Sequence, residues 1–106
     1  MSNKDITIII NTFNSDEKIF SCLDSIDKAF QVLVIENSKN TQFKKDIENK
    51  YNNVTCELAN DNLGYAKGNN FGLSKVKSKF ALVLNPDTLL EQNTLDNFLI
   101  TANKEP

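Results

Sequence analysis

The stretch Ile6–Asn14, ITIIINTFN, decides the fold class, because an apolar run changes abruptly into a polar one. Ile6–Ile10 is rich in β-branched residues and nearly continuous in its apolar character. Such a run is typical of a strand that is covered on both faces, as in a parallel sheet. The stretch therefore predicts a buried parallel strand that ends in a polar loop.

Apolar runs and amphipathic segments alternate along the rest of the chain. Val32–Ile35 and Phe80–Leu84 predict two more buried strands, and Val54–Leu58, which alternates more, predicts an edge strand. Helices are predicted from four further segments: the stripe Ile19, Cys22, Leu23 and Ile26, the stripe Phe43, Ile47 and Tyr51, the run from about Tyr65 to Val76, and the stripe Leu95, Phe98, Leu99 and Ala102. The order β-α-β-α-β-α-β-α predicts one α/β domain over 1–106, with an open, mainly parallel four-stranded sheet and helices on both faces.

Composition excludes several classes of function. The 106 residues are 40% hydrophobic and 25% charged, which is typical of a globular domain. The net charge is -2 and the lysines are scattered among acids, so no nucleic-acid-binding face is expected. The chain has no histidine, which excludes a histidine-based catalytic triad and a histidine-ligated zinc site within it.

The expected location is the cytoplasm. No apolar run approaches the roughly 20 residues of a transmembrane segment, and no signal peptide is recognisable. Cys22 and Cys56 form no CxxC motif and lie in apolar segments, so we expect buried free thiols in a reducing compartment.

Polar residues follow three of the four predicted strands. In chain order they are Thr12 and Asn14, then Glu36, Asn37 and Ser38, then Asn85 and Asp87. Each taken singly is more typical of a turn than of a ligand. Because the carboxyl ends of parallel strands share one edge, where open α/β sheets bind ligands, their recurrence favours a binding site.

Three glycines, Gly64, Gly68 and Gly72, are spaced by four residues and share one helical face. A glycine weakens a helix by about 1 kcal/mol relative to alanine, so three in one stripe predict a close approach to the backbone. Tight packing against the sheet and proximity of an anionic ligand to the helix N-terminus are equal alternatives for Gly68 and Gly72. For Gly64 the anionic ligand is favoured.

The motifs ITIIINTFN, VLVIENSKN, NLGYAKGNNFG and ALVLNPDTLL together resemble the successive motifs of family 2 glycosyltransferases with the GT-A fold. They are most similar to the rhamnosyltransferase-like branch of that family. The resemblance covers nearly the whole chain. It implies a Rossmann-like half-domain that binds a nucleotide-diphosphate sugar, the donor for transfer to a glycan or lipid-linked acceptor in polysaccharide biosynthesis.

The resemblance also implies roles for individual residues. The implied nucleotide-sugar-binding residues are Thr12, Phe13, Asn14, Glu36, Asn37, Asn62, Gly64, Lys67, Asn69 and Asn85. Glu36 takes the place of an acid, usually aspartate, that reads the nucleobase. Asp87 matches the last acid of the DXD-type motif, which implies that it holds Mg²⁺ or Mn²⁺. Such a cation neutralises the diphosphate leaving group, and it prefers oxygen ligands.

No catalytic base is expected in this chain, because in the family that acid belongs to the second half of the domain. The sequence thus leaves open whether the chain is the donor half of an enzyme, a non-catalytic GT-A-like interaction module or an inactive truncated product. A receiver-type signalling domain is disfavoured, since it needs an acidic cluster where this chain has Asn11–Asn14. A half-domain exposes apolar surface, so we expect a homodimer or a missing C-terminal half as partner.

Overall fold

The computed structural model describes residues 5–13, 17–59, 63–91 and 94–95 of the chain. Strands and helices alternate as the sequence predicts, and the predicted final helix lies mostly outside the described residues. The elements are β1 (Ile6–Thr12), α1 (Glu17–Asp24), β2 (Gln31–Glu36), α2 (Thr41–Lys50), β3 (Val54–Leu58), α3 (Gly64–Lys75) and β4 (Phe80–Leu84).

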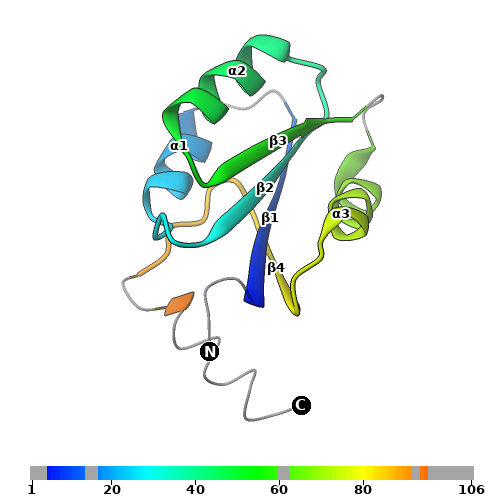
Figure 1. The fold of residues 1–106 in the computed structure, drawn as a ribbon. Helices are drawn as coiled ribbons and strands as arrows, with labels where there is room; N and C mark the ends of the chain where they lie inside the picture. Colours follow the sequence, from blue (N-terminus) through cyan, green and yellow to red (C-terminus); the bar gives the residue numbers. More distant parts are fainter. Residues whose placement is uncertain (1–4, 14–16, 60–62, 92–93, 96–106) are drawn as a thin grey trace.

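The four strands form one parallel sheet in the order β3-β2-β1-β4. β3 lies at an edge, as its alternating sequence predicts. The chain moves outward from β1 through β2 to β3 and then returns to the other side of β1, so the strand order reverses between β1 and β4. Helices α1 and α2 cover one face of the sheet, and α3 covers the other (Figure 1). The predicted α/β architecture is therefore confirmed.

The main hydrophobic core lies between the sheet and the two helices α1 and α2. Ile6, Ile8 and Ile10 of β1 belong to this core and are fully buried. The apolar stripe predicted on the first helix lies in the same core, with Cys22 at 0% and Leu23 at 3% exposure. Periodicity alone thus identified the buried face of α1.

The α3 face of the sheet holds a smaller apolar cluster, made of Leu33, Ile35 and Ala59 with Leu63 packed against it. Here the helix backbone lies very close to the strands. A Cβ placed on Gly72 would lie 2.8 Å from Cγ2 of Ile9. Packing against the sheet therefore accounts for this glycine.

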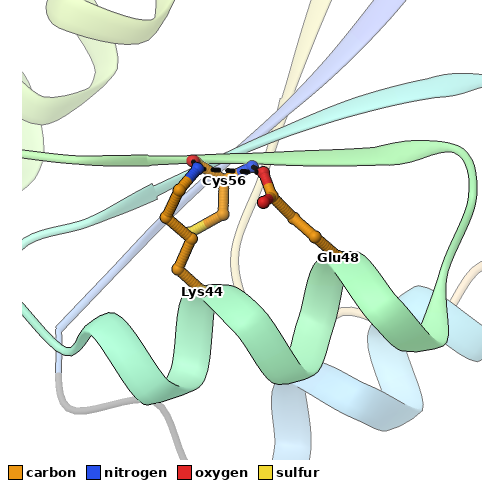
Figure 2. Close-up of polar contacts among 3 residues, drawn as sticks. All are labelled: Lys44, Glu48 and Cys56. Carbon is orange, nitrogen blue, oxygen red and sulfur yellow. Dashed lines mark hydrogen bonds and ion pairs between the residues drawn. The ribbon is translucent and has the colours of Figure 1, made fainter.

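α2 covers the free edge of β3 through a lysine and a glutamate. The N–H of Ala59 bonds to the carbonyl of Glu36, so the backbone groups of odd-numbered residues in β3 point toward β2. The backbone N–H and carbonyl of Cys56 therefore point away from β2, although its side chain is buried. The outward N–H of Cys56 donates to Oε2 of Glu48 at 2.8 Å, and its carbonyl accepts from Nζ of Lys44 (Figure 2). Nζ of Lys44 also lies 3.0 Å from Oε2 of Glu48. The pair satisfies backbone groups that an edge strand otherwise leaves open to pairing.

In the part of the chain that the structure describes, no helix combines the length and apolar character that crossing a bilayer requires. Both cysteines are free and buried, as predicted.

The edge contact predicts a graded response to substitution of Glu48. Glu48→Ala leaves the N–H of Cys56 without its acceptor and should lower the free energy of unfolding by about 1–3 kcal/mol. Glu48→Gln retains an oxygen for that N–H and loses only the ion pair, so its loss should stay below about 1 kcal/mol. Urea denaturation followed by circular dichroism measures both, and equal losses would contradict the assignment.

The same contact predicts a dependence of stability on pH. The N–H of Cys56, with Lys44, holds the pKa of Glu48 below its ordinary value of 4.5. Because the folded-state pKa is the lower one, this stabilisation is complete above pH 4.5 and is lost as the pH falls through the folded-state pKa. On acidification the wild type should thus lose more stability than Glu48→Gln does. Parallel pH profiles would show that Glu48 contributes nothing.

Candidate functional site

The polar residues that follow β1, β2 and β4, called here the exits of these strands, lie at one edge of the sheet. In the parallel registers Thr12 lies opposite Glu36, and Ile10 lies opposite Leu84. The residues that follow each strand therefore leave the sheet on the same side. The reversal of strand order between β1 and β4 lies there as well, which is the place where open α/β sheets bind ligands.

The exit of β1 presents one buried and one exposed side chain. Thr12 is buried, and its carbonyl accepts the backbone N–H of Asn37 at 2.9 Å. Phe13 is 53% exposed, which is unusual for a large aromatic side chain. Asn14 lies outside the described residues.

Asn37 joins β1, β2 and the start of α3. Its Nδ2 donates to Oδ1 of Asn11 at 2.5 Å and to the carbonyl of Thr12 at 2.9 Å. Its Oδ1 accepts the N–H of Leu63 at 3.1 Å. The side-chain amide of Asn37 thus bonds within the protein, where it holds the end of β1 and the start of α3 in place. A direct contact to the nucleotide stays a prediction.

Asn11 extends this amide network and was given no role on sequence grounds. Its Nδ2 donates to the carbonyl of Gly64 at 3.0 Å, so β1 also holds the first residue of α3. The sequence signal was present, because Asn11 is the first polar residue after the apolar run Ile8–Ile10. The partner of that amide became visible only in the fold.

Glu36 closes β2 as predicted, but its side chain is fully buried. Oε1 accepts the N–H of Ser38 at 2.5 Å and also the hydroxyl of Ser38. The carboxylate of Glu36 therefore holds the turn after β2 through Ser38. Its predicted contact with a nucleobase is not tested by this arrangement.

The glycines of α3 separate into two kinds. Gly64 has a φ of +74° and open space around its Cβ position, so its conformation requires glycine. A Cβ on Gly68 would lie 2.3 Å from Oδ1 of Asn11. Packing against β1, one of the two predicted alternatives, therefore explains Gly68 as it does Gly72.

Two other predicted residues of α3 differ in exposure. Lys67 is exposed on the first turn of α3, one residue before Gly68. The Oδ1 atom of Asn69 is buried and has no hydrogen-bond partner among the described residues. Asn62 lies outside them.

Asn85, Pro86 and Asp87 form a tight turn at the exit of β4. The N–H of Thr88 donates to the carbonyl of Asn85 at 3.0 Å, and Pro86 restricts the backbone inside that turn. Asn85 and Asp87 are both exposed. The thiol of Cys22 on α1 lies 3.8 Å from the carbonyl oxygen of Asn85. Burial, followed by the nearby charge of Asp87, raises the pKa of Cys22 to about 11.

The oxygen donors at this turn fit a cation that shares its ligands with a substrate. Within the described ranges, no group of three or more aspartate, glutamate, cysteine or histidine side chains could hold a metal ion. Asp87 supplies one exposed carboxylate, and Mg²⁺ needs only one or two carboxylates when phosphates and waters complete its coordination. The turn therefore offers one exposed carboxylate, and its predicted role in holding Mg²⁺ or Mn²⁺ stays a prediction.

An open pocket of about 280 Å³ lies at the opposite end of the sheet, beside the end of α3. Thr7, Gln31 and Thr55, at the beginnings of three strands, line it together with Lys77. It contains none of the predicted site residues.

Comparisons with known proteins identify a family and a fold. The model of Glycosyl transferase family 2 matches residues 7–106. The crystal structure of S. aureus TarS 1-349 is similar, with a TM-score of 0.76 and 23% identity over 94% of this chain and 32% of that chain. The crystal structure of S. aureus TarS gives a TM-score of 0.75 and 23% identity over 94% of this chain and 20% of that one. A search of curated proteins finds no significant match.

The contact between Gly68 and Asn11 predicts an unusual effect of alanine in a helix. In Gly68→Ala the new methyl group must displace an Asn11 amide that Asn37 and Gly64 hold in place. We expect a net loss of about 1–3 kcal/mol from overpacking, although alanine raises helix propensity by about 1 kcal/mol. Chemical denaturation measures this loss.

Asn70→Ala is the matched control, since Asn70 is exposed on the same helix. It should leave stability unchanged or slightly raised. A Gly68→Ala protein as stable as the Asn70→Ala protein would contradict the close packing of α3 on β1.

Proposed function

The chain belongs to glycosyl transferase family 2, and from this we propose that it binds a nucleotide-diphosphate sugar with a divalent metal, as the donor half of a GT-A glycosyltransferase domain. The observation that carries the proposal is the common edge at which the exits of β1, β2 and β4 meet. An exposed aromatic ring, an exposed carboxylate and the start of a helix all belong to that edge.

The base and ribose are proposed to lie against the exits of β1 and β2. The exposed ring of Phe13 offers a surface on which a flat base can stack. Asn37 donates to the carbonyl of Thr12, and Glu36 accepts from Ser38, so both segments are held by hydrogen bonds within the protein. In this proposal Thr12 and Asn37 shape the base-binding site, and Glu36 reads the base.

The diphosphate is proposed to lie between the start of α3 and the turn after β4. Leu63, the residue that precedes α3, makes no side-chain capping hydrogen bond, and the N-terminus of a helix is suited to an anionic group. Lys67 adds an exposed positive charge on the first turn, and Gly64 permits close approach. Asn69, whose buried Oδ1 has no hydrogen-bond partner in the described part of the chain, belongs to the same predicted segment.

Asp87 is proposed to hold Mg²⁺ or Mn²⁺, with Asn85 as a neighbouring oxygen or amide donor. When bound, the cation neutralises the charge that develops on the diphosphate as the glycosidic bond breaks. Asp87 then has one task, which is to hold its carboxylate where the phosphate oxygens also reach. Pro86 and the hydrogen bond from Thr88 to Asn85 keep the turn in one shape for that purpose.

The proposal extends to three further properties. The chain is assigned to the rhamnosyltransferase-like branch, its acceptor is a glycan or a lipid-linked molecule, and its location is the cytoplasm. The chain spans 32% and 20% of the two similar structures, so the proposal is restricted to donor binding.

Calorimetric titration with UDP, GDP and dTDP, each with and without Mn²⁺, tests the proposal. We expect at least one diphosphate to bind in a metal-dependent manner. Asp87→Ala should weaken that binding by more than about tenfold, because the charge-assisted ligand to the metal is lost. Glu91→Ala, which removes another exposed carboxylate shortly after the turn, should bind as the wild type does.

Undiminished metal-dependent binding by Asp87→Ala would remove Asp87 from its role. Absence of binding for all three nucleotides would favour the alternative of a non-catalytic interaction module.

A further inference from the structure

We propose that Ser25, assisted by Cys22, positions the metal-binding turn, so that α1 determines where the carboxylate of Asp87 lies. The inference rests on the proposed function of Asp87 and adds residues that no motif indicated. The segment Asn85–Leu90 passes beside α1 instead of projecting freely from the edge of the sheet (Figure 1).

The first contact of this segment with α1 is at the start of the turn. The thiol of Cys22 donates to the carbonyl of Asn85 at a sulfur–oxygen distance of 3.8 Å. Cys22 is itself fully buried in the main core, which holds its thiol in place. The same carbonyl accepts the N–H of Thr88, which closes the turn around Asp87. The carbonyl oxygen of Asn85 therefore both contacts α1 and closes the turn.

The second contact is at the far end of the segment and is stronger. The N–H of Leu90 donates to Oγ of Ser25 at 3.0 Å. Oγ of Ser25 itself donates to the carbonyl of Cys22 at 2.6 Å, and a hydroxyl can accept and donate at once. The hydroxyl thus links the final turn of α1 to the segment after Asp87.

Ser25 is itself held in place, which makes it a suitable anchor. Its N–H bonds to the carbonyls of Ser21 and Cys22, both at 3.1 Å, directly after α1 ends at Asp24. Leu90 packs against the main core next to this contact. A rigid helix end therefore holds the peptide three residues beyond Asp87.

Asp87 lies between these two anchors and is itself exposed. An exposed carboxylate on an otherwise free loop would sample many positions, whereas a metal ligand must stay close to one. Groups that orient a metal ligand typically contribute about 10–100-fold to metal affinity. Ser25 is thus a positioning residue that never touches the metal or the nucleotide.

The test compares Ser25→Ala with the conservative variant Ser25→Thr. The first readout is amide hydrogen exchange by NMR at Leu90 and Thr88, with Cys56 in β3 as the internal reference. The second is the Mn²⁺-dependent affinity for the nucleoside diphosphate that the wild type binds best among UDP, GDP and dTDP.

Ser25→Ala should accelerate exchange at Leu90 and Thr88, leave Cys56 unchanged, and weaken metal-dependent binding about tenfold. Ser25→Thr keeps the hydroxyl and should restore both values. Cys22→Ala should have a smaller effect than Ser25→Ala, and Cys22→Ser, which retains a donor, should have the smallest.

Wild-type exchange and wild-type affinity in Ser25→Ala would overturn the positioning role while leaving Asp87 in place. Accelerated exchange at Cys56 as well would show a general loss of stability and would also overturn it. If instead the wild type and Asp87→Ala bind nucleotide equally, the failure lies in the proposed function itself.

Discussion

The side-chain amide of Asn37 is the contact on which the candidate site depends. The pairing of β1 with β2 ends at Thr12 and Glu36, so beyond these residues no ladder holds the two exits together. Asn37 continues the connection through its backbone and side chain, both of which bond to the carbonyl of Thr12. Its remaining bonds reach Asn11 and Leu63, and thereby the start of α3. Leaving a buried donor or acceptor of this amide without a hydrogen bond would cost free energy of folding. The arrangement with all of these bonds formed is therefore favoured over alternatives that lack them.

The site combines two supports on opposite faces of the sheet. On the α3 face, the network of Asn11 and Asn37 holds the start of α3 against β1, and Gly68 allows the close approach. On the other face, the end of α1 holds the turn after β4 through Ser25 and Cys22. The two supports meet where the strand order reverses. Phe13 and Asp87 remain exposed at this edge, while Asn11, Asn37 and Glu36 bond within the protein.

The sequence predicted what depends on local pattern and left open what depends on contacts between distant residues. Apolar runs and a helical stripe were sufficient for the sheet, its edge strand and the buried face of α1, because burial imposes those periodicities. The predicted ligand residues Glu36 and Asn37 prove to be bonded within the protein, to Ser38 and to Asn11. No pattern specifies which of two polar side chains turns inward, since that choice depends on partners brought together only by the fold. The stripe of glycines likewise indicated a close approach without identifying Asn11 and Ile9 as the neighbours.

Paramagnetic broadening by Mn²⁺ in NMR spectra, recorded with a nucleoside diphosphate, tests the central claim most directly. The claim is that one edge of the sheet gathers a metal and a charged donor between the exits of β1 and β4 and the start of α3. The predicted result is strongest broadening at Asp87 and its turn, with weaker broadening at Phe13 and Gly64 that requires the nucleotide. Broadening centred on Thr7, Gln31 and Lys77, at the opposite end of the strands, would contradict the account, as would uniform broadening without a centre.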